Sequence, residues 1–220
     1  IKYATTRLRL SALRRRNKLM SHEDLVPGED LHLALRRIRR SNPANVRQAR
    51  GINSELLLRM INAQPKTLTG ARNRALLSLG YDFLARRSEL IALKINDVEI
   101  LLDGSMRAVI RRSKSDQFGR GRLVYGSARS AKLYRAWLKL KPRQIYWVFC
   151  AVNHRQCLDH PICGRSVNDI IKKSVCRCRG ERPRDHEVSG HSLRVGAAQD
   201  LLIAGHDLAA IMRAGGWSDL

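Results

Sequence analysis

Apolar residues recur every three or four positions along most of the chain, which is the spacing of one face of an α-helix. In residues 1–40 this pattern alternates with arginines and is broken at Pro27-Gly28, so it predicts two basic helices, the second over 30–40. The polar stretch Ser41–Gly51 follows and contains Pro43. We therefore expect a first domain over 1–44, a linker over 45–52 and a second domain over 53–220.

The second domain combines helical periodicity with one stretch of strand-like alternation. Ser54 and Ser88 are the expected N-caps of its first and third helices. A turn at Asp103-Gly104 between two apolar runs predicts a β-hairpin, and a short strand follows its loop. The expected helices cover 53–63, 70–85, 86–95, 127–140 and 166–176, with two more in 191–217; the expected strands cover 97–102, 106–112 and 123–125. The fold class is mostly α with a small antiparallel β-sheet (α+β).

His191 and Arg194 lie at the head of an apolar stripe that Val195, Ala198 and Leu202 continue. Residues three and four apart share one face of a helix. A cation on a face meant for burial is costly unless an opposite charge compensates it. A buried acid or an incoming anion would do so.

The net charge of the chain indicates which class of molecule it binds. Lys and Arg number 42 against 19 Asp and Glu, which gives a formal net charge of +23. Nucleic acid is the leading candidate for the compensating anion, and an anionic membrane surface is second. Aromatic residues are only 5%, which disfavours stacking platforms for single strands and favours duplex phosphate contacts. No membrane span or signal peptide is visible, and a start at Ile1 suggests a fragment or a processed form.

The five cysteines are odd in number and clustered, which is not typical of a secreted disulfide framework and favours a reducing cytoplasm. A zinc module is the alternative for this region. Its candidate ligands are Cys157, His160, Cys163, Cys176, Cys178 and His186. Their spacings do not form a standard paired knuckle, so we expect no metal.

Four further residues are candidates for an anion-binding site, because of their side-chain chemistry and their positions near turns or helix ends. Arg86 precedes a helix start, where anions bind, although an arginine near a turn is most often a solvated surface residue. Glu89 one turn later is by default a capping carboxylate. Lys114 lies in the hairpin loop and is either one charge among several or a mobile proton donor. Trp217 follows Gly215-Gly216 and is either a core aromatic or an indole N–H donor.

The stretches "ARRSEL", the hairpin lysine, "GHSLRVGAAQD" and "AGGW" occur in the order and spacing of the tyrosine site-specific recombinases, the phage integrase family, which the chain resembles over nearly its whole length. The basic "LALRRIRR" segment resembles the end of that family's helical DNA-clamp domain. The resemblance implies the tyrosine recombinase catalytic fold, preceded by part of the clamp.

The resemblance also implies a role for each candidate. Arg86 and Arg194 would grip the scissile phosphate, and Lys114 would protonate the leaving 5′ oxygen. His191 would assist proton transfer, Trp217 would donate to a phosphate oxygen, and Glu89 would support the site. Expected DNA contacts are Arg14, Arg15, Arg16, Arg36, Arg37, Arg39, Arg40, Arg112, Arg120 and Arg122. The family uses neither metal nor other cofactor.

One departure from the family's pattern concerns the nucleophile, which is a tyrosine beyond the tryptophan. The tyrosines here are Tyr3, Tyr81, Tyr125, Tyr134 and Tyr146. We therefore expect residues 1–220 to lack the nucleophile and to be inactive alone.

The expected function is site-specific recombination of double-stranded DNA through a covalent 3′-phosphotyrosine, by a tetramer on two DNA sites in the cytoplasm at the nucleoid. The alternatives are DNA binding without catalysis and a telomere resolvase or type IB topoisomerase, which share the chemistry.

Overall fold

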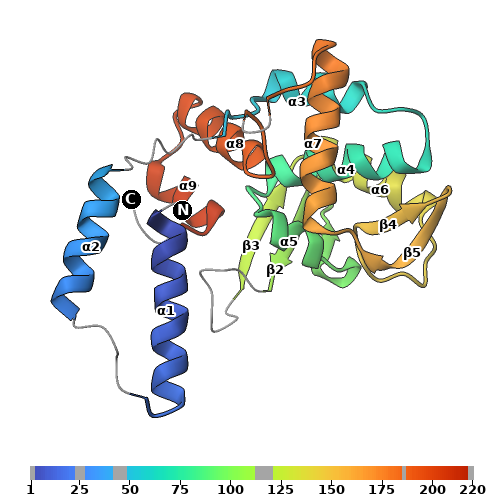
Figure 1. Ribbon diagram of the computed structural model, residues 1–220. Coiled ribbons are helices and arrows are strands. Elements are labelled where there is room, and N and C mark those ends of the chain that lie inside the picture. Colours follow the sequence, from blue (N-terminus) through green and yellow to red (C-terminus); the bar gives the residue numbers. More distant parts are fainter. Residues whose placement is uncertain (1–2, 23–27, 42–48, 112–120, 185–186, 218–220) are drawn as a thin grey trace. The chain divides into compact units, whose positions relative to one another are not determined.

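The computed structural model describes residues 3–22, 28–41, 49–111, 121–184 and 187–217. Its contacts divide the chain into two compact units, 1–47 and 48–220, and the division falls inside the predicted linker. Unit 1 contains helices α1 (Tyr3–Leu19) and α2 (Gly28–Ser41), which contact each other (Figure 1). No described residue of α2 is buried, and Leu8 and Leu19 of α1 are largely exposed.

Unit 2 is built around one buried helix, α4 (Leu68–Asp82), which contacts α3, α6 and α8 (Figure 1). Eleven of its 15 residues are buried, because its sequence is apolar or small on nearly every side. The other helices are α3 (Ser54–Asn62), α5 (Arg87–Ala92), the 3-10 turn η1 (Ile95–Asp97), α6 (Ala128–Leu140), α7 (Gly164–Arg179), α8 (Ser192–Ile203) and α9 (Leu208–Gly215). Within the described ranges, no helix is both long and apolar enough to cross a membrane.

The predicted hairpin is confirmed and forms a three-stranded antiparallel sheet of β1 (Val98–Ile100), β2 (Met106–Ile110) and β3 (Arg122–Gly126). Its inward face carries Met106, Ala108 and Val124, which are almost fully buried. The prediction of a single sheet is wrong, since β4 (Cys150–Asn153) and β5 (Gln156–Pro161) form a second hairpin.

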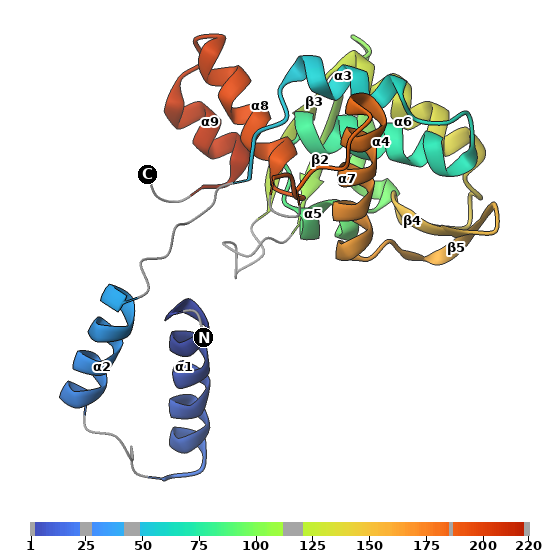
Figure 2. The same cartoon turned by 45° about the horizontal axis from the view of Figure 1, so that its top comes forward.

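The β4–β5 hairpin lies at the end of unit 2 away from α8 and α9 (Figure 2). Its turn residues His154 and Arg155 both have positive φ, at 43° and 65°. Such a turn is normally marked in a sequence by Asn-Gly or Asp-Gly. Because His-Arg stands there instead, the sequence gives no turn signal.

Two predicted helix caps are also wrong. Asn53, not Ser54, is the N-cap of α3, and its side chain accepts from the backbone N–H of Leu56 at 3.0 Å. Arg86, not Ser88, is the N-cap of α5, and its backbone N–H donates to Glu89 at 2.8 Å. A glutamate at the third helical position thus caps this helix instead of a serine.

Candidate active site

Glu89 is the buried centre of a group of arginines at the start of α5. Its side chain is 0% exposed. Arg86 Nη1 donates to its Oε1 at 2.9 Å, and Arg122 Nη2 donates to its Oε2 at 2.7 Å. Two guanidinium groups therefore compensate one buried carboxylate, which satisfies its hydrogen bonds and leaves a surplus of positive charge. We call Arg86, Glu89, Arg122 and Arg194 the arginine cluster.

Arg86 and Arg122 also bind the end of α9. Arg86 Nη2 donates to the carbonyl of Gly216 at 2.7 Å, and Arg122 Nη1 donates to the carbonyl of Ala214. Arg122 shares the inward side of β3 with Val124 and Gly126, and this period-two alternation is the sequence signal for its position. It lies inside the site, and only 15% of its side chain is exposed.

The two glycines of "AGGW" give Trp217 its place. Gly216 has φ +63°, a left-handed conformation that favours glycine. A Cβ on Gly215 would lie 2.0 Å from the Trp217 ring, so no larger residue fits there. The chain therefore turns back after α9 and lays the indole over Arg194, with the guanidinium carbon 3.8 Å from the ring centroid.

Arg194 is fully buried, on the helix face that the sequence pattern marks for burial. Its Nη1 donates to the carbonyl of Leu84 at 2.6 Å, and Trp217 covers one face. Its Nε and Nη2 have no hydrogen-bond partner among the described residues. Leaving buried donors unpaired is costly, so they point to a ligand that accepts hydrogen bonds.

The apolar stripe of α8 also differs from the prediction. Leu193 and Ala197 are buried, whereas Leu202 is 56% exposed. Ala198 and Leu202 instead line an open apolar groove of about 290 Å³ between α8 and α9, together with Trp217. The stripe that continues from Arg194 therefore lines a groove, and Ala198 in it also packs against the core.

Electrostatics in the site favour an anion. Burial lowers the pKa of Arg194 to about 10, and repulsion from Arg86 and Arg122 contributes to this. Arg194 remains cationic at neutral pH. Partial burial also lowers the pKa of His191, the N-cap of α8, and Arg194 and Arg86 lower it further. A neutral imidazole therefore lies beside a concentrated positive charge.

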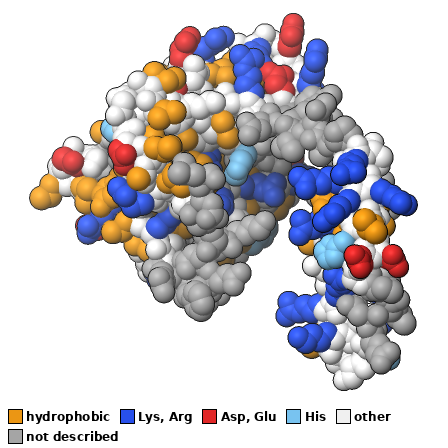
Figure 3. Space-filling view, turned by 90° about the vertical axis from the view of Figure 1, so that its left-hand side faces the viewer, with side chains coloured by type: hydrophobic (Ala, Val, Ile, Leu, Met, Phe, Trp, Pro, Cys, Tyr) orange, Lys and Arg blue, Asp and Glu red, His pale blue; other side chains and the backbone are white. Residues whose placement is uncertain are grey.

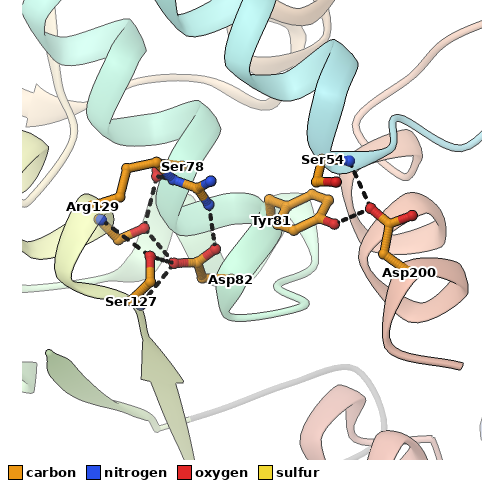
Figure 4. Close-up of polar contacts among 8 residues, drawn as sticks. Ser54, Ser78, Tyr81, Asp82, Ser127, Arg129 and Asp200 are labelled. Carbon is orange, nitrogen blue, oxygen red and sulfur yellow. Dashed lines mark hydrogen bonds and ion pairs between the residues drawn. The ribbon is translucent and has the colours of Figure 1, made fainter. Parts of the chain in front are cut away.

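A second polar network anchors α8, the helix that carries His191 and Arg194. Asp200 accepts from the backbone N–H of Ser54 at 2.6 Å and from the Tyr81 hydroxyl (Figure 4). A Cβ on Gly196 would lie 1.8 Å from the carbonyl of Ile52, so glycine permits α8 to lie directly against the preceding chain. These contacts fix α8 against α3 and α4.

Figure 4 also shows a network outside the site, where α4 ends beside α6. Asp82 accepts from Arg129 at 2.8 Å and from both Ser127 and Ser130 at 2.6 Å. Asp82 joins α4 to α6 through these bonds, and none of its partners among the described residues belongs to the arginine cluster. This ion pair resembles Arg122–Glu89 in length and in the burial of its carboxylate.

The remaining predicted cations are placed as follows. Lys114, Arg112 and Arg120 lie outside the described residues. Seven predicted DNA contacts are exposed on α1 and α2 of unit 1, where Figure 3 shows closely spaced basic side chains: Arg14, Arg15, Arg16, Arg36, Arg37, Arg39 and Arg40. Their exposure is compatible with phosphate contacts, which stay a prediction.

The zinc alternative has no support within the ranges that the structure describes. No three Cys, His, Asp or Glu residues there are placed to hold a metal ion. Cys163 is the N-cap of α7, and Cys176 and Cys178 lie near its other end. His186, the last candidate ligand, lies outside the described residues.

Known proteins that are similar to this chain are recombinases and integrases. Residues 52–220 match the model of the phage integrase family. The chain is 26% identical over 229 residues to the recombinase Cre of Escherichia phage P1, covering 96% of this chain and 65% of the relative. It is 30% identical over 158 residues to an integrase/recombinase XerD homolog of Selenomonas ruminantium, covering 66% of this chain and 42% of the relative.

A solved structure, the XerH site-specific recombinase bound to its difH substrate, has the same fold. It matches with a TM-score of 0.61 at 22% identity, over 77% of this chain and 48% of that one. The chain spans about two thirds or less of each of these relatives. Because the family model covers most of the chain, including the whole arginine cluster, this protein belongs to the phage integrase family.

Proposed function

We propose that this chain carries the phosphate-binding catalytic site of a tyrosine recombinase, which cuts and rejoins duplex DNA at specific sites. The observation that carries the proposal is the pair of unpartnered donors on buried Arg194, next to Arg86 and under Trp217. A phosphodiester offers the negative charge and the acceptor oxygens that this arrangement lacks. Family membership supports the same reading.

In the proposed reaction the residues of the site act on a phosphate that a separate nucleophile attacks. A nucleophilic oxygen attacks the scissile phosphorus and the bond to the 5′ oxygen breaks, so charge builds on the non-bridging oxygens. Arg86 and Arg194 are preorganised to stabilise that charge, since they are already fixed by Glu89, Gly216 and Leu84. A neutral His191 takes or returns a proton, and Lys114 protonates the leaving oxygen. Trp217 supports Arg194 and donates to phosphate.

A covalent 3′-phosphotyrosine intermediate would retain the energy of the broken phosphodiester bond for joining to a second strand. We do not assign this nucleophile to a tyrosine of residues 1–220. Tyr81 donates to Asp200, and burial raises its pKa above the ordinary value. Tyr134 is buried in α6 with its pKa raised to about 12. Tyr125 points outward from β3, and Tyr146 stacks beside Trp147.

Double-stranded DNA is the proposed partner. The basic helices of unit 1 and the net charge of +23 favour phosphate contact over a wide surface. The XerH structure contains its DNA substrate, which supports the same partner here. We further propose that recombination occurs in a tetramer on two DNA sites, in the nucleoid, as the resemblance to the family implies.

A trapping experiment tests the function. A duplex is first selected by binding from a random pool, labelled in each strand, and incubated with the protein as its gene encodes it. After denaturation, label is expected on the protein, and it should disappear in the Arg86→Ala variant. Tight binding without an adduct would mean a DNA-binding protein without catalysis. An adduct formed by residues 1–220 alone would show that one of the five tyrosines, or another side chain of this segment, is the nucleophile.

A further inference from the structure

Arg122 bonds three separate parts of unit 2 although it is the first residue of β3. Its Nη2 donates to Glu89 Oε2 at 2.7 Å, and its Nη1 donates to the carbonyls of Ala214 and Phe83, the latter at 3.4 Å. Its side chain is 15% exposed, and its Nε is buried without a hydrogen-bond partner among the described residues. The planar fork of arginine suits such bridging, and lysine has no equivalent.

Both ends of this bridge lead to groups that would hold the phosphate. Glu89, on one side, also accepts from Arg86 at 2.9 Å. The last turn of α9, on the other side, leads into Gly216 and Trp217. A Cβ on Gly216 would lie 3.0 Å from Arg122 Nε and 3.6 Å from Arg86 Nη1, so this turn packs directly on both guanidinium groups.

We propose that Arg122 is a positioning residue for DNA cleavage, which fixes Arg86 through Glu89 and fixes Trp217 over Arg194 through the end of α9. This inference rests on the proposed function. It also replaces the expectation that Arg122 contacts DNA. Both terminal nitrogens of Arg122 bind protein acceptors, which ties its side chain to Glu89 and to the end of α9. Arg86 makes a similar pair of bonds, and it is assigned to the phosphate because it lies in the family motif "ARRSEL", which does not include Arg122.

The first test separates the cleavage rate from DNA affinity. Arg122→Gln should lower the single-turnover cleavage rate at saturating DNA by about 100-fold, the scale expected when catalytic groups shift by about 1 Å. The Kd for duplex and its salt dependence should stay at the wild-type values. A weaker Kd with a salt slope reduced by about one would make Arg122 a phosphate contact and overturn the inference. An unchanged cleavage rate would overturn it as well.

Arg129→Gln is the matched control, because it removes an arginine–carboxylate pair of similar length outside the site. It should cost stability and leave the cleavage rate near wild type. Equal rate losses in both variants would indicate a general loss of structure and contradict a positioning role. If wild type itself forms no adduct, the proposed function fails, and the outcome for Arg122 is then decided by the exchange measurement below.

Two further measurements keep the inference testable if the Arg122→Gln variant folds poorly. Arg122→Lys keeps the charge but has one donor atom in place of a fork, so it should not restore the cleavage rate. A wild-type rate in that variant would show that charge alone suffices. Hydrogen exchange of residues 211–217 should speed up in both variants of residues 1–220, while α3 keeps its wild-type rate. Unchanged exchange at 211–217 would contradict the bridge without any reference to cleavage.

Discussion

Arg194 combines full burial, a stacked aromatic ring and two donors without partners among the described residues. The arginine cluster holds three guanidinium groups against one carboxylate, Glu89. Removing such charges from water is costly, and their mutual repulsion adds to the cost. A bound phosphate would compensate the buried charges and offset the repulsion between the guanidinium groups. The free protein therefore holds an unfavourable concentration of positive charge that substrate binding relieves.

The pKa of His191 reports on the positive charge of the arginine cluster. Its pKa in the free protein should lie below the ordinary value of 6.5, because partial burial and the neighbouring Arg194 and Arg86 disfavour the imidazolium. NMR titration of the His191 ring, assigned with His191→Gln, measures this. Adding selected duplex should raise the pKa, since phosphate screens the arginines. A ring that titrates at or above 6.5 in the free protein would contradict the arrangement.

The same shift has a consequence for stability. The folded protein binds a proton at His191 less readily than the unfolded chain does, so unfolding is accompanied by proton uptake between the two pKa values. The contribution of His191 to the free energy of unfolding is therefore complete above 6.5 and falls as the pH drops below it. Denaturant titrations of wild type and His191→Gln across that pH range measure this fall as the difference between their free energies of unfolding.

At the scale of elements, α5, α8 and the turn after α9 together hold the residues of the site in place. α8 brings Arg194 from one side, and the Gly215-Gly216 turn returns Trp217 from the other. α5 supplies Arg86 at its N-terminus, with Glu89 as its cap. Each of these placements depends on a local backbone feature and not on a long loop.

Gly215→Ala tests the turn. Its Cβ would lie 2.0 Å from the Trp217 ring, so the indole must leave its place on Arg194. We expect the cleavage rate to fall by about 10- to 100-fold, while helix propensity is slightly improved. In a Trp217→Ala background the same substitution should have little further effect. Additive losses in the double variant would show that Gly215 acts through something other than Trp217.

Tyr81→Phe tests the anchor of α8. Loss of the hydroxyl bond to Asp200 should lower the free energy of unfolding by about 1–2 kcal/mol, measured by urea denaturation. Asp200 still accepts from Ser54, so cleavage should change little. Tyr146→Phe, at a half-exposed tyrosine, is the control and should change stability by less than about 0.5 kcal/mol. Equal effects of the two variants would exclude the proposed anchor.

The sequence predicts most helices and the β1–β2 hairpin, because their apolar periodicity is regular and Asp103-Gly104 marks the turn. It misses β4–β5, where His154-Arg155 adopts a turn that only the folded context stabilises. Helical spacing puts His191 and Arg194 on one helix, and the structure places them at the N-cap and in the first turn of α8. The sequence does not reveal what holds Arg194 in place, because the contacts come from Leu84 and Trp217, which are distant in sequence.

At the scale of the molecule, charge is the dominant property. The chain has 42 basic and 19 acidic side chains, and the resulting excess of positive charge produces self-repulsion that a polyanion relieves. Units 1 and 2 both contribute, unit 1 through exposed arginines and unit 2 through the buried arginine cluster. We expect the exposed arginines to contribute mainly to DNA affinity and the buried arginine cluster to contribute mainly to catalysis.

Affinity for duplex should therefore fall steeply with salt, with a log–log slope of about −0.9 for each phosphate contact. Replacing Arg36, Arg37, Arg39 and Arg40 by glutamine should flatten that slope, because these exposed side chains are the proposed phosphate contacts on α2. Fluorescence anisotropy at several salt concentrations measures both. An affinity independent of salt would refute the electrostatic basis of binding.

The central claim is that Arg194 stabilises charge on the phosphate during cleavage, and its most direct test is the single-turnover rate of Arg194→Ala at saturating duplex. We expect a fall of about 10²- to 10³-fold, the loss typical of one preorganised donor to a developing anion. The Kd for the same duplex should change by less than about tenfold, since many exposed cations remain. A near wild-type rate together with a collapse of affinity would contradict the claim and make Arg194 a residue for DNA binding alone.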